Sequence, residues 1–304
     1  MNNTQQKRSL GLLLAFLGTF LFALKSIFIK LAYFEGLNSD VVLMLRMAIA
    51  LPIYLGILSY IFCKKDKSKA LTQTTFFSII GLGFIGYFLA SLLDLKGLET
   101  ISAGLERLTL FTYPIFTAIL GAIFFSTPLT KRIVIVLITT YLGLWTMFNQ
   151  ESLLNDSNDI GTGVILVLFS ALSYAFYVLS SKKIISSIGS VLFTAIAMSA
   201  SSAFVLFFYF LLFDFSQVSI SHNAWLWVFL LAIVSTVIPS FLISEAIHRI
   251  SPLQTSIVGM LGPVVTIILA VFILSEPFGM YQILGVSLVM LGVGLLTFRR
   301  QIKK

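Results

Sequence analysis

Ten stretches of about 20 predominantly apolar residues follow one another along this chain. A helix of that length crosses the hydrocarbon core of a bilayer and satisfies its own backbone polar groups there. Of the 304 residues, 58% are hydrophobic and 11% are charged, whereas about a quarter of the residues in soluble domains are charged. We therefore expect an all-α membrane protein with ten transmembrane helices. The predicted helices cover residues 10–31, 41–62, 74–96, 101–125, 133–148, 160–181, 191–213, 224–247, 253–274 and 280–298.

The chain offers little material for metal, redox or nucleotide chemistry. Its one cysteine, Cys63, cannot form an internal disulfide, and two histidines are too few for a typical histidine-built metal site. Neither the phosphate-binding pattern GxxxxGK[ST] nor the zinc-protease pattern HExxH occurs. We expect no metal, no cofactor and no catalytic residues, so an enzyme is not predicted.

The positive charges indicate orientation in the membrane rather than binding of nucleic acid. Although the net charge is +8, 15 of the 20 Lys and Arg residues lie between apolar stretches on one common side, and such an excess marks cytoplasmic loops. We expect a multi-pass protein of the cell inner (plasma) membrane, surrounded by membrane lipid, with both termini cytoplasmic. The 15 residues are Lys7, Arg8, Lys64, Lys65, Lys67, Lys69, Lys131, Arg132, Lys182, Lys183, Arg249, Arg299, Arg300, Lys303 and Lys304.

The second half of the chain repeats the first at a shift of 149 residues. Over residues 97–148 ten positions are identical at this shift, among them Pro114 with Pro263 and Thr117 with Thr266. Each half holds five predicted helices, an odd number, so the second half is expected to be inverted in the membrane. Inverted repeats are typical of transporters that expose one central site to each side in turn.

The segments YPIFTAILGAIFFSTPLT and GPVVTIILAVFILSEPF, at the ends of the fourth and ninth predicted helices, resemble the EamA-type branch of the drug/metabolite transporter superfamily. The resemblance covers nearly the whole chain. It implies two EamA-like five-helix repeats, residues 1–150 and an inverted repeat over 151–304. The family often has an acidic residue before the closing proline; Glu276 keeps that pattern, whereas Thr127 departs from it.

Five ionisable side chains of the first half are predicted to share one depth. With a rise of about 1.5 Å per residue, Lys25, Arg46, Asp94, Glu106 and Arg107 reach a similar level from four predicted helices. Glu106 and Arg107 point about 100° apart around their helix, so each needs a partner elsewhere. Asp94 is the candidate partner of Arg107, and Lys25 or Arg46 that of Glu106.

The charge balance of this layer predicts the kind of ligand. Three cations and two anions leave one positive charge, and an unpaired buried charge is costly. We therefore expect a substrate with an anionic or zwitterionic end. Two other interpretations stay open: an ion-pair cluster that only fastens the helices together, and a role for Asp94 or Glu106 as a proton carrier.

Tyrosines are the second group of candidate site residues. Tyr174 and Tyr177 lie one turn apart on the sixth predicted helix, and Tyr113 lies on the fourth. These side chains are candidates for lining the same cavity, although aromatic stripes also serve packing. Since Tyr177 aligns with Lys25 between the halves, we expect the second half to supply stacking and hydrogen bonds where the first supplies charge.

Together these features predict a secondary transporter that exports a small polar metabolite, an amino acid or related organic ion, by alternating access. Because the chain lacks an ATP-binding motif, the energy has to come from a gradient, with a proton or counter-ion as the coupling partner. The alternatives are a flippase of a lipid-linked substrate and a membrane enzyme.

Overall fold

The computed structural model describes residues 3–63, 71–125, 131–154, 159–212, 220–250, 255, 258–259 and 261–298. These residues form helices joined by short connections, with no strand among them. Seven helical stretches in this part of the chain are long and apolar enough to cross a membrane. An all-α membrane protein is thus confirmed. Thr127 and the predicted cytoplasmic segments 64–70 and 299–304 lie outside the described residues.

The helices are named here in chain order. They are α1 (Asn3–Phe34), α2 (Ser39–Cys63), α3 (Gln73–Gly83), η2 (Phe84–Leu89), α4 (Ala90–Thr100), α5 (Ala103–Leu110), α6 (Tyr113–Phe125), α7 (Lys131–Leu154), α8 (Ile160–Ile188), α9 (Ser190–Leu212), α10 (His222–Ala232), η4 (Ile233–Val237), α11 (Ile238–Ile250), α13 (Leu261–Leu274) and α14 (Met280–Phe298).

The predicted spans differ in how fully the structure supports them. The seven long apolar stretches are Ser9–Phe34, Ser39–Cys63, Gln73–Thr100, Ala103–Phe124, Ile160–Ile188, Ser190–Leu212 and His222–Ala246. Two shorter apolar helices, Leu261–Leu274 and Met280–Gly292, follow them. The fifth predicted span lies in α7, which is 24 residues long. The count of ten spans and the inversion of the halves stay predictions.

The fourth predicted helix is broken rather than continuous. Helix α5 ends at Leu110, Phe111 and Thr112 form a turn, and α6 begins at Tyr113. Pro114 accounts for the break, because proline lacks the N–H group that would donate to the carbonyl oxygen of Leu110 in a continuous helix, and its ring clashes with that carbonyl. In the first turn of α6 the missing N–H group has no cost, and Pro263 likewise lies in the first turn of α13.

Two helices each contain one π-helical segment. Segment η2 begins at Phe84 between α3 and α4, and η4 begins at Ile233 between α10 and α11. In η4 the Thr236 hydroxyl donates to the carbonyl oxygen of Leu231 at 2.8 Å. The two starting residues are 149 positions apart, which is the shift of the sequence repeat. Single-turn π segments inside α-helices are frequently found at functional sites.

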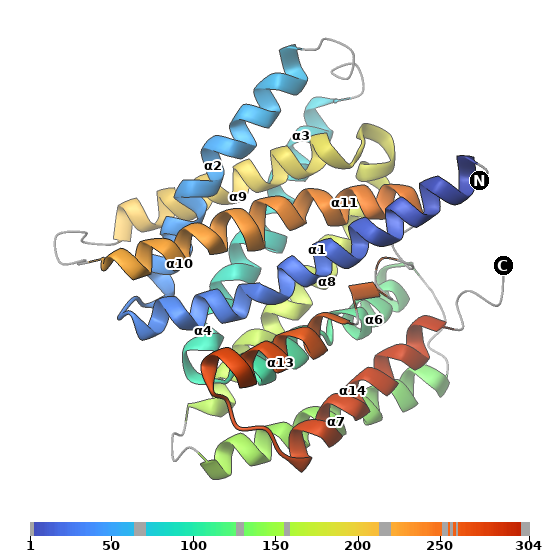
Figure 1. Ribbon diagram of the computed structural model, residues 1–304. Helices are drawn as coiled ribbons and strands as arrows, with labels where there is room; N and C mark the ends of the chain where they lie inside the picture. The colour runs from blue at the N-terminus through green and yellow to red at the C-terminus, as the bar shows by residue number, and fades with distance from the viewer. Residues whose placement is uncertain are drawn as a thin grey trace.

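Helices of the two halves interleave. Helix α1 packs against α11, α10 and α13, while α8 packs against α4, α5 and α6. Helix α2 contacts α9, and α7 runs beside α14 (Figure 1). The start of α1 and the end of α14 lie on the same side of the bundle in Figure 1. The helices of one half therefore bury their faces mainly against the helices of the other.

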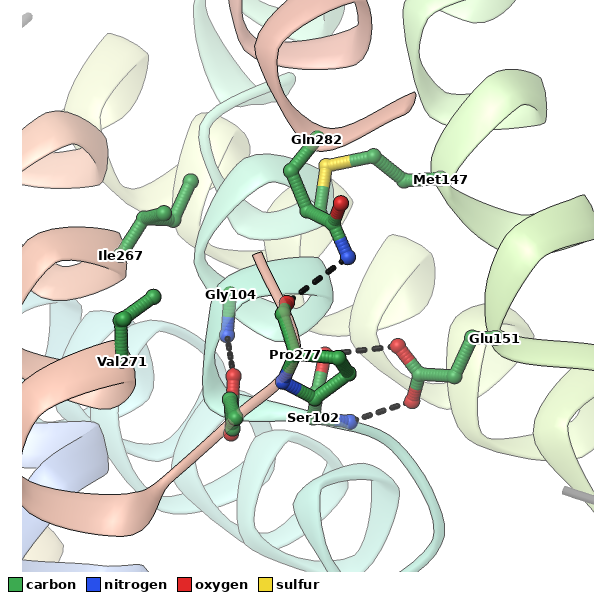
Figure 2. Close-up of a pocket in the computed structure, with 9 residues that line it drawn as sticks. Ser102, Gly104, Met147, Glu151, Ile267, Val271, Pro277 and Gln282 are labelled. Carbon is green, nitrogen blue, oxygen red and sulfur yellow. Dashed lines mark hydrogen bonds between the residues drawn. The ribbon is translucent and has the colours of Figure 1, made fainter. Parts of the chain in front are cut away.

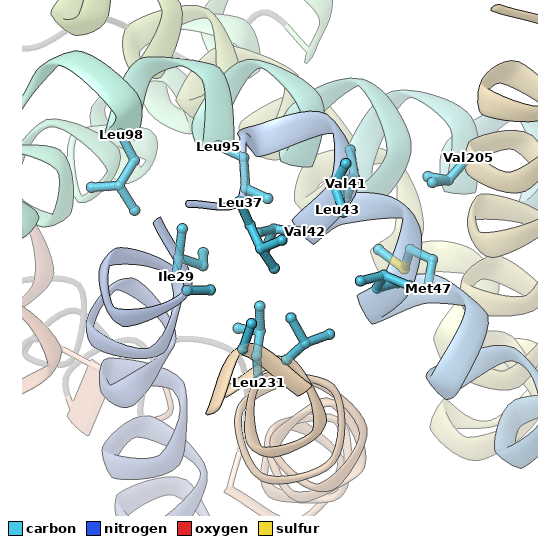
Figure 3. Close-up of a cluster of buried hydrophobic side chains, with 14 of the residues drawn as sticks. Ile29, Leu37, Val41, Val42, Leu43, Met47, Leu95, Leu98, Val205 and Leu231 are labelled. Carbon is cyan, nitrogen blue, oxygen red and sulfur yellow. The ribbon is translucent and has the colours of Figure 1, made fainter. Parts of the chain in front are cut away.

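The largest hydrophobic core joins α1, α2, α4, α9 and α10. Ile29, Val42, Leu95 and Leu231 point toward one another from four of these helices (Figure 3). Many large apolar side chains lie on the outside instead, with Phe272 82% exposed. Such exposure is unfavourable in water and suits contact with lipid.

Candidate functional site

A cavity of about 200 Å³ lies between helices of both halves. We call it the central cavity. Six of the eight side chains predicted for the site line it: Lys25, Arg46, Asp94, Arg107, Tyr113 and Tyr174. The other lining residues are Thr19, Phe22, Ala23, Gly86, Tyr87, Ala90, Ser91, Leu110, Phe111, Ser170, Val178, Ile243, Thr255, Gly259, Gly262 and Pro263.

Lys25 and Asp94 form a buried ion pair at the edge of this cavity. The Lys25 ammonium on α1 donates to Asp94 Oδ2 on α4, and the side chains are 6% and 1% exposed. The predicted pairing of Asp94 with Arg107 is therefore wrong: the residue that donates to Asp94 is Lys25. Lys25 and Asp94 reach each other because α1 lies directly against α4.

Arg46 reaches the cavity from α2 with its guanidinium incompletely paired. Its Nε donates to the Thr236 hydroxyl in η4 at 2.8 Å, while its Nη1 has no partner among the described residues. The residue is 2% exposed. A buried guanidinium N–H without an acceptor is costly, and its fork geometry suits a carboxylate.

Arg107 on α5 joins three helices. Its Nη2 donates to the carbonyl oxygen of Phe22 on α1 at 2.7 Å, and its Nε donates to the Thr266 hydroxyl on α13 at 3.2 Å. The Thr266 hydroxyl itself donates to the carbonyl oxygen of Ala23 at 2.9 Å. This network fixes the guanidinium in the cavity wall, and no carboxylate among the described residues forms an ion pair with it.

Glu106 lies behind the cavity wall and does not line it. Its Oε2 accepts a hydrogen bond from the Ser26 hydroxyl at 2.6 Å, and the residue is completely buried. The predicted pairing of Glu106 with Lys25 or Arg46 is therefore wrong. Lys25 forms its ion pair with Asp94, and Arg46 donates a hydrogen bond to Thr236 in η4.

Four tyrosines, two from each half, form an aromatic wall: Tyr87, Tyr113, Tyr174 and Tyr177. Tyr113 packs edge-on against Tyr174 with ring centroids 5.2 Å apart, and Tyr174 stacks on Tyr177 at 5.9 Å. Tyr177 contacts Tyr87 edge-on at 5.0 Å. Tyr177 does not line the cavity, so it supports the wall from behind. Its ring fits there because Gly86 has no side chain: a methyl group would lie 2.3 Å from the ring.

A second, smaller cavity of about 120 Å³ lies at the start of α5. Glu151 accepts hydrogen bonds from the backbone N–H and the hydroxyl of Ser102 at 2.5 and 2.6 Å (Figure 2). Glu276 accepts from the backbone N–H groups of Ala103 and Gly104 at 2.7 and 3.2 Å. These bonds satisfy N–H groups that a helix leaves unpaired at its start, where the helix dipole also favours negative charge.

Burial raises the pKa of Glu276 above its ordinary value of 4.5, and the two backbone hydrogen bonds oppose this shift. We call Glu151 and Glu276, together with the α5 residues they bind, the α5 clasp. Within the part of the chain that the structure describes, no three His, Cys, Asp or Glu side chains come together as metal ligands.

Several residues of the site were not singled out from the sequence. The hydroxyls of Ser26, Thr236 and Thr266 are the direct partners of Glu106, Arg46 and Arg107. Such partners depend on which helices meet, which a single sequence does not give. Two features of the sequence could have pointed to site residues. Thr266 belongs to an identical pair of the repeat, and the cavity-lining residues Tyr87 and Ser91 precede Asp94 at helical spacing.

Comparison with known proteins identifies relatives of the whole chain. The model of the EamA-like transporter family matches residues 9–149 and 161–298. The chain is 29% identical over 288 residues to the uncharacterized transporter YcbK of Bacillus subtilis (strain 168), covering 90% of this chain and 88% of that protein. It is 28% identical over 255 residues to the uncharacterized transporter YyaM of the same organism, covering 82% and 81%.

Two further matches are a relative of lower sequence identity and a solved structure. The uncharacterized transporter sll1319 of Synechocystis sp. is 24% identical over 322 residues, covering 96% of this chain and 94% of that protein. A solved crystal structure superposes with a TM-score of 0.69 over 97% of this chain and 99% of its own, at 14% sequence identity. At that sequence identity the superposition shows only that the two proteins share a fold.

Proposed function

Because the chain belongs to the EamA-like transporter family, we propose that it is a secondary transporter of the cell inner membrane that exports a small zwitterion or organic anion, such as an amino acid. Its role is passage of a solute, with no chemical change to it. The observation that carries this proposal is that Arg46 lines the central cavity and that its buried Nη1 has no acceptor among the described residues.

The charges around the cavity support a carboxylate as the recognised group. Lys25 and Asp94 neutralise each other, so Arg46 and Arg107 supply the excess positive charge in the lining. Arg107 is already held by Phe22 and Thr266. A substrate carboxylate that accepts from Arg46 Nη1 supplies the missing hydrogen bond and balances the charge.

The size and the walls of the cavity support a small substrate. A volume of about 200 Å³ is below the roughly 300–1,000 Å³ of pockets for drug-sized ligands. The rings of Tyr113 and Tyr174 line the same cavity as the charged residues and offer it apolar faces. A compact molecule with one charged end and one apolar or planar part matches both walls.

Alternating access requires two halves that move against each other. We assign these halves to residues 1–150 and 151–304 as inverted repeats. Reciprocal contacts support the assignment: a methyl group on Gly11 would lie 2.4 Å from Ile250, and a methyl group on Gly163 would lie 2.8 Å from Ile101. Ile101 and Ile250 correspond at the shift of 149 residues, as do the two π-helical segments.

The proposed orientation has both termini in the cytoplasm. The ends of α1 and α14 that carry the chain termini lie on one side of the bundle (Figure 1). The α5 clasp belongs to the opposite helix ends, because its Glu276 precedes the start of α14, whereas the other end of α14 lies beside the start of α1 (Figure 1). In this orientation the clasp closes the outer side.

Comparison of metabolites tests the proposal. Cells that overproduce the wild-type protein are expected to release at least one amino acid or related ion faster than cells with the Arg46→Gln variant. Lys96→Gln is the matched control, because Lys96 is 45% exposed and lies 3.8 Å from Asp40, outside the cavity. Equal metabolite levels with wild-type, Arg46→Gln and empty vector would reject the proposed function. Single Lys25→Ala and Arg107→Ala variants extend the test to the other cavity cations.

A further inference from the structure

Two buried hydrogen bonds join α2 of the first half to η4 and α11 of the second. Arg46 Nε donates to the Thr236 hydroxyl at 2.8 Å, and the hydroxyls of Tyr54 and Ser240 lie 3.1 Å apart. Arg46 and Tyr54 lie on one face of α2, and Thr236 and Ser240 are one turn apart on the facing helix. All four residues are buried. The two bonds therefore hold α2 in a fixed register against η4 and α11.

The π-helical turn gives the Thr236 hydroxyl a fixed direction. A hydroxyl group has one hydrogen to donate and two lone pairs that accept. Thr236 donates its hydrogen to the carbonyl oxygen of Leu231, five residues earlier, at 2.8 Å, which is the spacing of a π turn. Toward Arg46 the hydroxyl therefore acts only as an acceptor, and Arg46 Nε supplies the hydrogen.

An anchored Nε determines how the rest of the guanidinium group is held. The group is planar and rigid, so fixing one N–H bond restricts the directions of the others. Arg46 lines the central cavity, and its buried Nη1 has no acceptor among the described residues. Without the anchor, the long arginine side chain has more rotamers to populate, and a ligand that binds it has to order it first.

The equivalent position of the first half also belongs to the site. Tyr87 in η2 corresponds to Thr236 in η4 at the shift of 149 residues. Tyr87 lines the central cavity, whereas Thr236 does not. Tyr87 and Val237 pack in one small hydrophobic cluster, so the two π segments share a core. Each π segment thus contributes a side chain from the corresponding position, one directly and one through Arg46.

We propose that Thr236 is a positioning residue for substrate binding, which holds Arg46 so that Nη1 is presented to the substrate carboxylate. This inference rests on the proposed function and deepens it, because it makes η4 of the second half responsible for orienting a charge that the first half supplies. Every substrate recognised through its carboxylate depends on this anchor, whatever its other groups are. Loss of the Thr236 hydroxyl therefore weakens the binding of all such substrates.

Solid-state nuclear magnetic resonance tests the anchor without a substrate. The full-length protein is labelled with ¹⁵N-arginine in lipid bilayers, and the Nε–H signal of Arg46 is assigned by its loss in Arg46→Gln. Its order parameter should be about 0.85, as in a rigid backbone, in wild type and in Thr236→Ser, which keeps the hydroxyl. In Thr236→Val, which keeps the shape without the hydroxyl, it should fall below about 0.6. Equal order parameters in wild type and Thr236→Val overturn the proposal.

Transport kinetics test the consequence for binding. Each proteinogenic amino acid is offered separately to proteoliposomes that contain the full-length protein, and uptake is measured at rising concentration. For those that wild type transports, Thr236→Val should raise the half-saturating concentration about tenfold, equivalent to ~1.4 kcal/mol, and leave the maximal rate unchanged. Thr236→Ser should restore the wild-type value. A lower maximal rate with an unchanged half-saturating concentration overturns the proposal.

Ser240→Ala is the matched control. It removes the neighbouring contact with Tyr54 from the same interface, and the Ser240 hydroxyl also donates to its own helix, at the carbonyl oxygen of Val237, 2.7 Å away. Neither Tyr54 nor Ser240 lines the central cavity. This variant loses a similar contact between the halves and should keep the wild-type half-saturating concentration. An equal rise in Ser240→Ala would show that Thr236 affects only the packing of the helices, and the positioning role would be wrong.

Failure of this inference is distinguishable from failure of the proposed function. If wild type transports none of the amino acids and the metabolite comparison shows no release, the proposed function is wrong and the positioning role falls with it. If wild type transports amino acids and Thr236→Val has the wild-type half-saturating concentration, the positioning role alone is wrong.

Discussion

Glu276 accepts a 2.7 Å hydrogen bond from the backbone N–H of Ala103, which fastens the connection between α13 and α14 to the first turn of α5. The two residues are 173 positions apart and belong to different halves of the chain. The bond thus joins the half that carries the charged residues to the half that carries Glu276. Any movement that separates the halves at this end has to break it.

Removal of this carboxylate should destabilise the protein measurably. In Glu276→Ala the N–H groups of Ala103 and Gly104 lose their acceptors, and loss of a helix cap costs about 0.5–2 kcal/mol. Thermal unfolding of the purified variant in detergent should therefore begin at lower temperature than that of wild type. Glu245→Ala is the control, since its partly exposed pair with Arg249 is worth about 1 kcal/mol or less. Equal losses in both variants would contradict a capping role for Glu276.

The pH dependence of stability should report the same carboxyl group. Burial raises the pKa of Glu276 in the folded protein above its ordinary value of 4.5, so the folded state binds its proton more tightly than the unfolded state. The stabilising effect of that proton is complete below pH 4.5 and is lost as the pH rises through the raised folded pKa. Relative to Glu276→Gln, wild type should become less stable across this interval. A difference in unfolding temperature that is constant with pH, or that grows in the opposite direction, would refute the raised pKa.

Gly86→Ala should disturb the aromatic wall. The added methyl group would lie 2.3 Å from the Tyr177 ring, so Tyr177 has to move away from Tyr87, and overpacking of this kind costs about 1–3 kcal/mol. Gly81→Ala is the matched control five residues earlier, where a methyl group meets no atom within 4 Å. We expect a clear fall in unfolding temperature for Gly86→Ala only. Similar stability of the two variants would show that the wall tolerates displacement of Tyr177.

Thr266→Val should loosen the contact between the two halves around Arg107. The hydroxyl is lost while the shape is nearly kept, so Arg107 Nε and the carbonyl oxygen of Ala23 each lose a partner, at about 1–3 kcal/mol. Thr117→Val removes the hydroxyl of the equivalent residue, whose one hydrogen bond among the described residues is to the Tyr113 carbonyl oxygen of its own helix, at 2.9 Å. Chemical denaturation should show the larger loss for Thr266→Val. If Thr117→Val costs as much, the hydroxyl network at Arg107 contributes nothing beyond a local bond.

The sequence predicted the class of protein and the depth of each charged residue in the membrane, because both follow from local patterns. Apolar length determines which segments cross a membrane, and the rise per residue determines the level of each charge. The prediction that Lys25, Arg46, Asp94 and Arg107 share one level agrees with the single cavity that they line. Their roles in substrate binding stay predictions.

Which charged side chains contact each other could not be predicted from such local patterns. Which side chains meet depends on the rotation of each helix and on how closely the helices approach, and neither follows from depth. Asp94 was paired with Arg107 in the sequence analysis but meets Lys25 in the structure, and Glu106 meets the uncharged Ser26. The fourth predicted helix, residues 101–125, is broken before Tyr113, and its apolar length did not indicate this break. The π-helical segments left no recognised mark in the sequence.

Helix α5 is only eight residues long, with the clasp at one end and a turn at the other. Its adjacent residues Glu106 and Arg107 face different surroundings: one contacts Ser26 and the other the cavity. Because neighbouring side chains on a helix keep a fixed angle of about 100°, a rotation of α5 cannot move one without moving the other. Release of the clasp would turn both side chains together, so the clasp, Glu106 and Arg107 would respond as a single mechanical unit.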